Sequence, residues 1–426
     1  MRLSLLLFTA TLPAATYHGD VKRILDTRCV VCHREGEIAP MKFTNYAEVK
    51  PWAKAIRQAV LRKSMPPWHA DPARSVAFHN DRSLSAKEIA TITAWVDEGA
   101  AEGKAGERGE GPAPIAVPAT KPDFVAKIPG IPVPATGTIE YTFLVTPTNF
   151  ERDVWISAAE WRIDQRSVVH HINAFIRPKG SSYVRDEHPG KPFVASVQSR
   201  RAKREDEREV DRRELLLGYE PGYRPMPWGE GRAKLLPKGA DIVFEIHYTA
   251  NGKPVTDHSE LALFFAAQPP KERVFTISPA DAQFAIPAGA NLHSSLTGAV
   301  TRREVTLLSM QPHMHLRGKT YSIAVRYPNG LVESLIDVPR YDFRWQTTYF
   351  LREPKRLPKN TELQCLAQFD NSPNNAANPD PKQVVRWGDQ SWEEMNICFM
   401  EVTFPAGDDP DVVTLLGTTR PGAATR

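Results

Sequence analysis

Residues 241–247 read DIVFEIH, a stretch in which apolar side chains recur at every second position and which ends on a histidine. A period of two residues is typical of a β-strand. Similar short stretches, separated by turn residues, lie at residues 139–145, 321–326 and 362–366. This texture predicts antiparallel sandwich or jelly-roll domains, and therefore a mainly β fold, from about residue 137 onward.

The composition fits a folded protein that has no nucleic-acid partner. Hydrophobic residues make up 41% of the chain, which is enough for sizeable cores, and the formal net charge is only +4 because 54 basic residues are nearly balanced by 50 acidic ones. A nucleic-acid-binding protein would need a concentrated basic face. The charged run at residues 199–214 is best explained as a solvated helix or loop.

The N-terminal residues predict export. Residues 1–15 carry a basic residue, then a largely apolar run, then small residues, which is the order found in a signal peptide. The apolar run is too short to span a bilayer, and no later stretch approaches about 20 apolar residues. We therefore expect an exported protein, periplasmic or otherwise outside the cytoplasm, with no stable membrane span.

A haem attachment signature follows the signal peptide. Residues 29–33 read CVVCH, in which Cys29 and Cys32 would form thioethers to the haem vinyl groups and His33 would be the proximal iron ligand. A thioredoxin-like redox pair or a zinc site would need flanking elements that this stretch lacks. The motif therefore predicts one covalently bound haem c.

The distal iron ligand is expected to be a methionine or histidine from a loop. We favour Met65, because the two prolines after it fix the backbone and a thioether ligand raises the haem potential. Met41 and His69 are the alternatives. A capping box at residues 85–88, followed by apolar residues at helical spacing up to Gly99, predicts a helix. Over residues 17–105 the chain resembles a small class I cytochrome c.

Further candidate metal ligands lie in the β region. Residues two apart on a strand point to the same face, so His313 and His315 present two imidazoles to one point. His170 and His171 are adjacent and would point to opposite faces, so both reach one metal only at a strand end or a bulge. Taken singly, such histidines are more often structural than metal-binding.

The order of the motifs carries more information than any one of them. A His-His pair, a His-Tyr, a His-x-His and a Glu-Met follow one another, which resembles the copper type II, ascorbate-dependent monooxygenases, a family that includes the peptidylglycine α-hydroxylating and dopamine β-monooxygenases. The resemblance covers residues 137–415 and implies two β-sandwich domains, each with one copper. It implies an electron-storing copper on His170, His171 and His247, and an oxygen- and substrate-facing copper on His313, His315 and Met395.

The sequence departs from the peptide-amidating members of this family. Those members hold the substrate carboxylate with an Arg, an Asn and a Tyr, and the matching positions here are Gln311, Ile397 and Phe399. A peptide C-terminus is therefore a poor candidate for the substrate, and the pocket is less charged.

The cysteines also differ from the family pattern. The family disulfide joins a strand cysteine to the position occupied here by Asn396. Cys398 lies two residues further along and keeps the same strand parity. A disulfide between Cys365 and Cys398 is therefore a hypothesis, consistent with an oxidising compartment.

These observations predict a mainly β protein with two tandem antiparallel β-sandwich copper domains behind a small all-α cytochrome c domain. The predicted order is a signal peptide (1–15), a cytochrome c domain (17–105), a linker rich in Pro, Gly and Ala (106–136), two sandwiches (137–275 and 276–415) and a tail (416–426).

The expected function is that of a copper-dependent monooxygenase, an oxidoreductase that hydroxylates a C–H bond of a small organic substrate with O2. It would use two copper ions and the haem, with the fused cytochrome as electron donor and an external reductant or redox partner protein. The alternative is a non-catalytic periplasmic haem and copper protein for electron transfer or copper binding.

Overall fold

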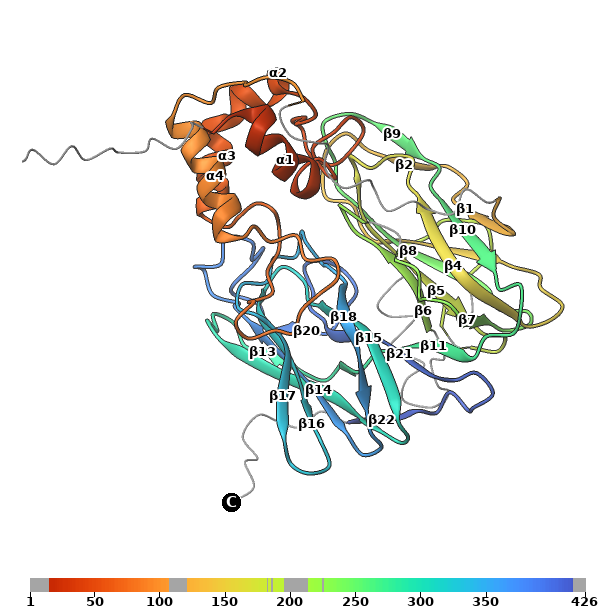
Figure 1. Ribbon diagram of the computed structural model, residues 1–426. Coiled ribbons are helices and arrows are strands. Elements are labelled where there is room, and N and C mark those ends of the chain that lie inside the picture. Colours follow the sequence, from red (N-terminus) through yellow and green to blue (C-terminus); the bar gives the residue numbers. More distant parts are fainter. Residues whose placement is uncertain are drawn as a thin grey trace, which may run out of the picture. The chain divides into compact units, whose positions relative to one another are not determined.

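The structure, a computed structural model, describes residues 15–106, 121–181, 183–184, 187–194, 214–223 and 226–416. Nearly all of the predicted signal peptide, the charged run and the C-terminal tail lie outside these residues. The chain divides into two compact units, Met1–Trp68 with Arg82–Pro114, and His69–Asp81 with Ile115–Arg426. The protein is mainly β and has few helices (Figure 1). No helix in the described parts is both long and apolar enough to cross a membrane.

The first unit is helical. Its predicted last helix is confirmed, because the Ser85 side chain accepts the Glu88 N–H at 3.2 Å and the Glu88 carboxylate accepts the Ser85 N–H at 2.7 Å. Gly99, with φ +95°, follows the end of this helix. Apolar side chains form one core around the fully buried Trp95. The elements are a π-helical turn (Tyr17–Val21), α1 (Lys22–Arg28), α2 (Tyr46–Val49), a 3-10 turn (Lys50–Trp52), α3 (Ala53–Leu61) and α4 (Ala86–Asp97).

The second unit is built on a nine-stranded sheet. Its main path runs in the spatial order β1 (Phe124–Lys127), β10 (Glu260–Phe265), β4 (Val154–Arg162), β7 (Arg232–Leu236), β11 (Glu272–Ile277), β21 (Asn396–Pro405), β15 (Val305–His313) and β18 (Tyr349–Leu357), and β12 (Ala280–Asp281) pairs with β21.

Two further sheets face this one. The four-stranded sheet has the order β3 (Thr142–Pro147), β8 (Asp241–Tyr248), β5 (Val169–Arg177) and β6 (Glu214–Tyr219). The five-stranded sheet has the order β17 (Val332–Val338), β16 (Gly318–Arg326), β19 (Glu362–Phe369), β14 (His293–Thr301) and β22 (Val413–Leu416). Two small ladders join β2 (Ile131–Val133) to β9 (Val255–Asp257) and β13 (Ala285–Ile286) to β20 (Val385–Arg386). The four stretches with strand periodicity therefore fall on β3, β8, β16 and β19.

Apolar and polar contacts hold these layers together. A single core cluster includes Trp161 of β4, Ile172 of β5 and Phe244 of β8, so it joins the nine-stranded and four-stranded sheets. The five-stranded sheet contacts β21 through the Tyr321 hydroxyl, which lies 2.9 Å from Asn396 Oδ1. The Asn396 amide in turn donates to Ser295 Oγ of β14 at 2.8 Å.

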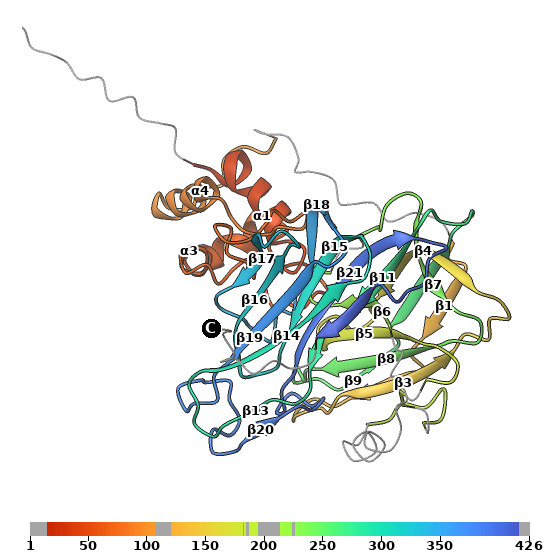
Figure 2. The same ribbon diagram turned by 90° about the horizontal axis from the view of Figure 1, so that it is seen from below.

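The nine-stranded sheet is continuous across the boundary predicted between residues 275 and 276, which falls inside β11. Strand β7 pairs with β11 in parallel, and β11 pairs with β21 in antiparallel fashion (Figure 2). The buried ammonium group of Lys234 on β7 reinforces this junction. It donates to Leu215 O at 2.7 Å and to Thr276 Oγ1 at 2.8 Å, and pairs with Glu401 at 2.9 Å.

Two stretches differ from the predicted domain order. The linker predicted for residues 106–136 is too long at its C-terminal end, because residues 124–127 and 131–133 form β1 and β2, whose inward side chains Ala126, Ile131 and Val133 are buried. Residues 69–81, inside the range predicted for the cytochrome domain, belong to the β unit. Both stretches owe their structure to pairing with distant strands, which local composition does not report.

The hypothesis of a Cys365–Cys398 disulfide can be tested on this fold. Cys365 of β19 and Cys398 of β21 are both fully buried thiols, and burial together with the neighbouring Cys365 raises the pKa of the Cys398 thiol. We expect the exported protein to carry this disulfide, since oxidation would link the two facing sheets. Peptide mapping by mass spectrometry without reduction should recover the linked peptides, and alkylation of both thiols in that experiment would reject the disulfide.

Candidate metal centre

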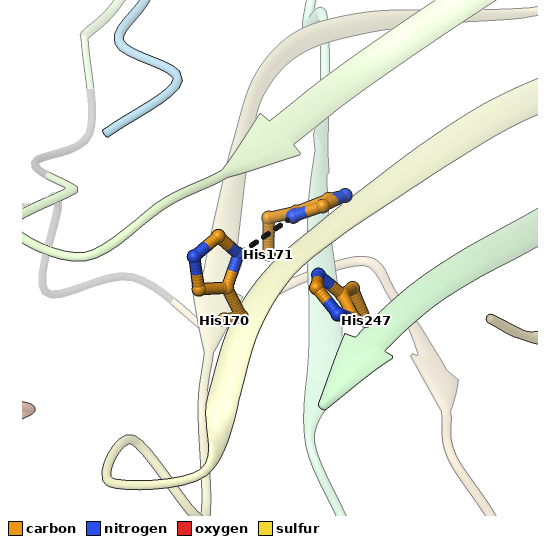
Figure 3. Close-up of side chains that lie close together, drawn as sticks. All are labelled: His170, His171 and His247. Atoms are coloured by element: carbon orange, nitrogen blue, oxygen red, sulfur yellow. Dashed lines mark hydrogen bonds between the residues drawn. The ribbon is translucent and has the colours of Figure 1, made fainter. Parts of the chain in front are cut away.

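Three histidines of the four-stranded sheet come together at one point. His170 and His171 begin β5, and His247 lies near the end of the neighbouring strand β8. One ring nitrogen from each lies within 4.8 Å of those of the other two, and the three imidazoles face one another (Figure 3). We call these residues the first cluster. They are the three histidines predicted for one copper, and their arrangement could hold a metal ion.

A β-bulge allows the two adjacent histidines to share this point. Val169 pairs with Tyr248 but His171 pairs with His247, so the register of β5 against β8 shifts at His170. The extra residue in a bulge redirects its side chain. The prediction that both rings meet only at a strand end or a bulge is therefore confirmed, and the Nδ1 atoms of His170 and His171 lie 3.0 Å apart.

The first cluster leaves buried ring nitrogens without a partner. His171 Nε2 and His247 Nδ1 are buried and make no hydrogen bond within the described structure. An unpaired buried polar atom costs free energy, and native structures rarely tolerate one without a ligand, ion or water. Burial also lowers the pKa of His170 to about 4 and that of His247 to about 3. All three rings are neutral near pH 7, which is the form of imidazole that binds metals.

The second pair of histidines lies on the nine-stranded sheet. His313 is the last residue of β15, and His315 lies two residues beyond the strand end. Their ring centroids are 5.2 Å apart, and both residues are almost completely buried. The predicted strand geometry holds for His313, while His315 sits on the turn into β16. Burial lowers the pKa of His313 to about 4 and that of His315 further.

Hydrogen bonds fix the orientation of both rings. His313 Nδ1 lies 2.5 Å from Gln346 Oε1, and His315 Nδ1 lies 3.2 Å from the carbonyl oxygen of Glu393. These oxygens only accept, so each Nδ1 must donate a proton. In a neutral imidazole the lone pair is then on Nε2, the atom that can bind a metal. Metal-binding histidines commonly have this second hydrogen bond.

Met395 is placed next to this pair by the chain. Strand β21 pairs Ile397 with His313, and Met395 precedes β21 by one residue. The buried Glu394 carboxylate accepts the His315 N–H at 2.8 Å and the Arg317 N–H at 2.5 Å. Glu394, the residue before Met395, is thus bonded to the turn that carries His315. Burial raises the pKa of Glu394 to about 8, although these N–H groups act in the opposite direction. His313, His315 and Met395 are the second cluster.

The two clusters share aromatic neighbours. The Phe343 ring centroid lies 5.5 Å from that of His170 and 5.7 Å from those of His247 and His315. Tyr141 stacks on His247 at 4.7 Å and lies 6.3 Å from His315. Two aromatic rings therefore lie beside histidines of both clusters, and the two clusters belong to one site.

The haem motif is in the helical unit. Cys29 and Cys32 follow α1 and are not joined in a disulfide. His33 Nδ1 lies 3.1 Å from the carbonyl oxygen of Met41, and its ring stacks on Phe43 at 4.2 Å. This hydrogen bond assigns the proton to Nδ1 and leaves Nε2 for the iron, so the residues fit a proximal haem ligand.

The candidates for the distal haem ligand are divided between the two units. Met65, 37% exposed, follows α3 in the helical unit, and the peptide bond to Pro66 is cis. His69 belongs to the β unit. Met41 lies eight residues after His33, and its backbone carbonyl bonds to the His33 ring. Met65 stays the predicted ligand.

Sequence reasoning missed four residues of the centre, which are Tyr141, Phe343, Gln346 and Glu394. Tyr141 lies in a predicted strand, but its contact with His247 depends on strand pairing. Phe343 and Gln346 are on an irregular loop with no periodicity. Glu394 belongs to the Glu-Met motif but was assigned no role there, and its position beside the proposed ligand Met395 was the one available signal.

Comparisons with known proteins add no identification. No protein-family model matches the chain, and no curated protein matches it. Among solved structures, T=1 particles derived from infectious bursal virus align over 69% of this chain and 73% of theirs, with 11% identity and a TM-score of 0.19. Infectious bursal disease virus strain Gt aligns over 72% of this chain and 80% of its own, with 10% identity and a TM-score of 0.14. Likeness at this level carries no inference about the fold or the function.

The role of Glu394 can be tested by substitution. Glu394→Gln keeps the shape but replaces one accepting oxygen with a donor, so it should disturb the His315 turn. We expect the metal affinity of the second cluster to fall roughly tenfold to a hundredfold, a typical effect of losing a residue that orients a ligand. Competition with a chelator measures the affinity. Glu333→Gln, at a half-buried ion pair with Lys355 on β18, is the control.

Proposed function

We propose that the protein is an exported, haem-bearing copper monooxygenase that hydroxylates a C–H bond of a small organic substrate. The observation that carries the proposal is the pair of buried histidine clusters that share Phe343, one with unpaired ring nitrogens and one with its Nδ1 atoms held by hydrogen bonds. We assign one copper to His170, His171 and His247. We assign the second, which faces oxygen and substrate, to His313, His315 and Met395.

The donor atoms favour copper. Three imidazoles suit copper in both oxidation states, and a thioether favours Cu(I). Zinc accepts three histidines but is disfavoured by a methionine ligand. Copper would supply the redox chemistry that activates dioxygen. This chain's own residues would hold the ring nitrogens in place, through Gln346 and the Glu393 carbonyl, and keep the site dry, through Phe343 and Tyr141.

The overall reaction needs two electrons from outside the site. A substrate R–H, O2, two electrons and two protons give R–OH and water. We propose that the haem of the N-terminal cytochrome domain, attached through Cys29 and Cys32 and ligated by His33 and Met65, delivers these electrons one at a time. An external reductant or redox partner protein would re-reduce it.

The side chains around Met395 indicate an uncharged substrate. Met395 belongs to a buried apolar cluster with Ile397, Phe399 and Phe175. The Gln311 side chain donates to Gln346 O at 3.0 Å. The positions that hold a carboxylate in peptide-amidating enzymes therefore carry two apolar residues and an engaged amide here, which favours an apolar organic molecule over a peptide C-terminus.

The proposal includes the finer architecture. The four-stranded sheet and the first half of the nine-stranded sheet would form one copper sandwich. The five-stranded sheet and the second half would form the other. Both would lie outside the cytoplasm, where oxidised copper and a c-type haem are maintained.

The main rival is a non-catalytic protein for electron transfer or copper binding. The same histidines would serve it, and the difference is whether the second cluster keeps a position open for oxygen. Three protein ligands at that cluster, His313, His315 and Met395, leave such a position, which favours the enzyme.

Metal content is the first prediction from this proposal. Purified full-length protein, loaded with copper, should contain one iron and two coppers per chain. His313→Ala should lower the copper content towards one, because the first cluster shares no ligand with the second. Elemental analysis beside a reduced haem spectrum measures both. One iron and no tightly bound copper would remove the mechanism.

Electron delivery is the second prediction. In stopped-flow experiments, the reduced haem of the copper-loaded protein should be oxidised when O2 is added, and Met395→Leu should slow the oxygen uptake strongly. The control is the copper-free protein under the same conditions. A haem that stays reduced would contradict the role as internal donor, and oxygen uptake that does not depend on Met395 would favour the non-catalytic rival.

A further inference from the structure

The loop between β17 and β18, residues 339–348, contacts both clusters. Phe343 packs among their histidines, and Gln346 accepts from His313 Nδ1. The Tyr341 hydroxyl donates to Met314 O at 2.8 Å and accepts the Met314 N–H at 3.0 Å. A Cβ at Gly318 would lie 2.6 Å from the Tyr341 ring, so only glycine permits this approach. We call residues 339–348 the bridging loop.

The bridging loop has little regular structure of its own. The backbone hydrogen bonds within it run from Trp345 N to Asp342 O and from Thr347 N to Trp345 O. A loop of this kind is held by its ends and by what packs on it. The parts that hold its two ends therefore decide how firmly Phe343 and Gln346 are placed.

Residues 69–81 hold the end that leaves β17. The N–H of Asp71 donates to Asp337 O at 2.8 Å, and the N–H of Val76 donates to Leu335 O at 3.0 Å. The Ser75 hydroxyl accepts the Asp337 N–H at 3.0 Å. We call residues 69–81 the strap. These contacts bond the strap to the end of β17, just before the bridging loop.

The same strap holds the end that enters β18. The Asn80 amide donates to Thr348 O at 2.7 Å and its oxygen accepts the Phe350 N–H at 3.1 Å. The N–H of His79 donates to Phe350 O at 2.7 Å. Phe78, 3% exposed, packs on Tyr349 with ring centroids 5.2 Å apart. One thirteen-residue segment therefore bonds to the chain on both sides of the bridging loop.

We propose that the strap is a positioning element for metal binding, which holds the bridging loop against both histidine clusters. This role rests on one part of the proposed function, the binding of copper at both clusters. Phe343 closes the first cluster and Gln346 orients a ligand of the second, so a looser bridging loop weakens metal binding at both.

The test uses the full chain with Asn80→Ala, which removes both side-chain hydrogen bonds at the β18 end. Copper affinity is measured by chelator competition in two backgrounds, His171→Ala to leave the second cluster and His313→Ala to leave the first. We expect roughly tenfold weaker binding in both, as for other residues that support ligands. Asn80→Asp, which keeps the acceptor for Phe350, should give a smaller loss. Asn329→Ala, in the exposed turn before β17, is the control and should change nothing.

Hydrogen exchange of the copper-free protein separates this proposal from the proposed function. Asn80→Ala should speed the exchange of the Trp345 and Thr347 amides while leaving β8 and β19 unchanged. Ser75→Ala repeats the test from the β17 end if the first variant does not fold. Unchanged exchange overturns the proposal whether or not copper binds. Faster exchange with unchanged copper affinity also overturns it, and a wild-type protein that binds no copper overturns the proposed function alone.

Discussion

The burial of five imidazoles within one β unit is the constraint on which the rest of the site depends. Each ring has lost the hydrogen bonds of water, and a buried nitrogen without a replacement is costly. Four of the ten ring nitrogens have a partner: the Nδ1 atoms of His170 and His171 bond to each other, and those of His313 and His315 donate to Gln346 and to a backbone carbonyl. His171 Nε2 and His247 Nδ1 stay unpaired. A bound metal would satisfy these atoms.

The continuous nine-stranded sheet explains how clusters from distant parts of the sequence come together. The first cluster lies on β5 and β8, and the second on β15 and the residue before β21. The parallel pairing of β7 with β11 joins the two halves of the sheet, and the buried Lys234–Glu401 pair lies at this junction. Breaking a buried ion pair by removing one partner costs about 3–5 kcal/mol. The relative placement of the clusters thus depends on the nine-stranded sheet, to which the four-stranded sheet that carries the first cluster is joined by a shared apolar core.

The sequence predicts those parts of the site that follow strand periodicity. It does not predict the parts whose position depends on pairing between distant strands. The need for a bulge at His170 followed from the two-residue period, and the strand ending on His247 followed from alternation in residues 241–247. The bridging loop has no period, and the contact of Phe343 with both clusters arises only when β17, β18, β5 and β15 are assembled. The prediction for the strap failed for the same reason. Local sequence places residues 69–81 in the helical region, and only their hydrogen bonds to Asp337 and Phe350 assign them to the β unit.

The strap also changes how the helical unit is connected along the chain to the β unit. A single flexible linker at residues 106–136 would allow a wide range of distances and a modest effective concentration of electron donor. The chain instead passes between the two units at residue 68, returns at residue 82, and passes again at residue 114. Each added connection shortens the free loop, which would lower the entropy lost in bringing the proposed electron donor to its acceptor. Met65, four residues before the strap, is covalently close to the segment that holds the bridging loop, so the proposed electron delivery and the proposed metal binding would depend on the same stretch of chain.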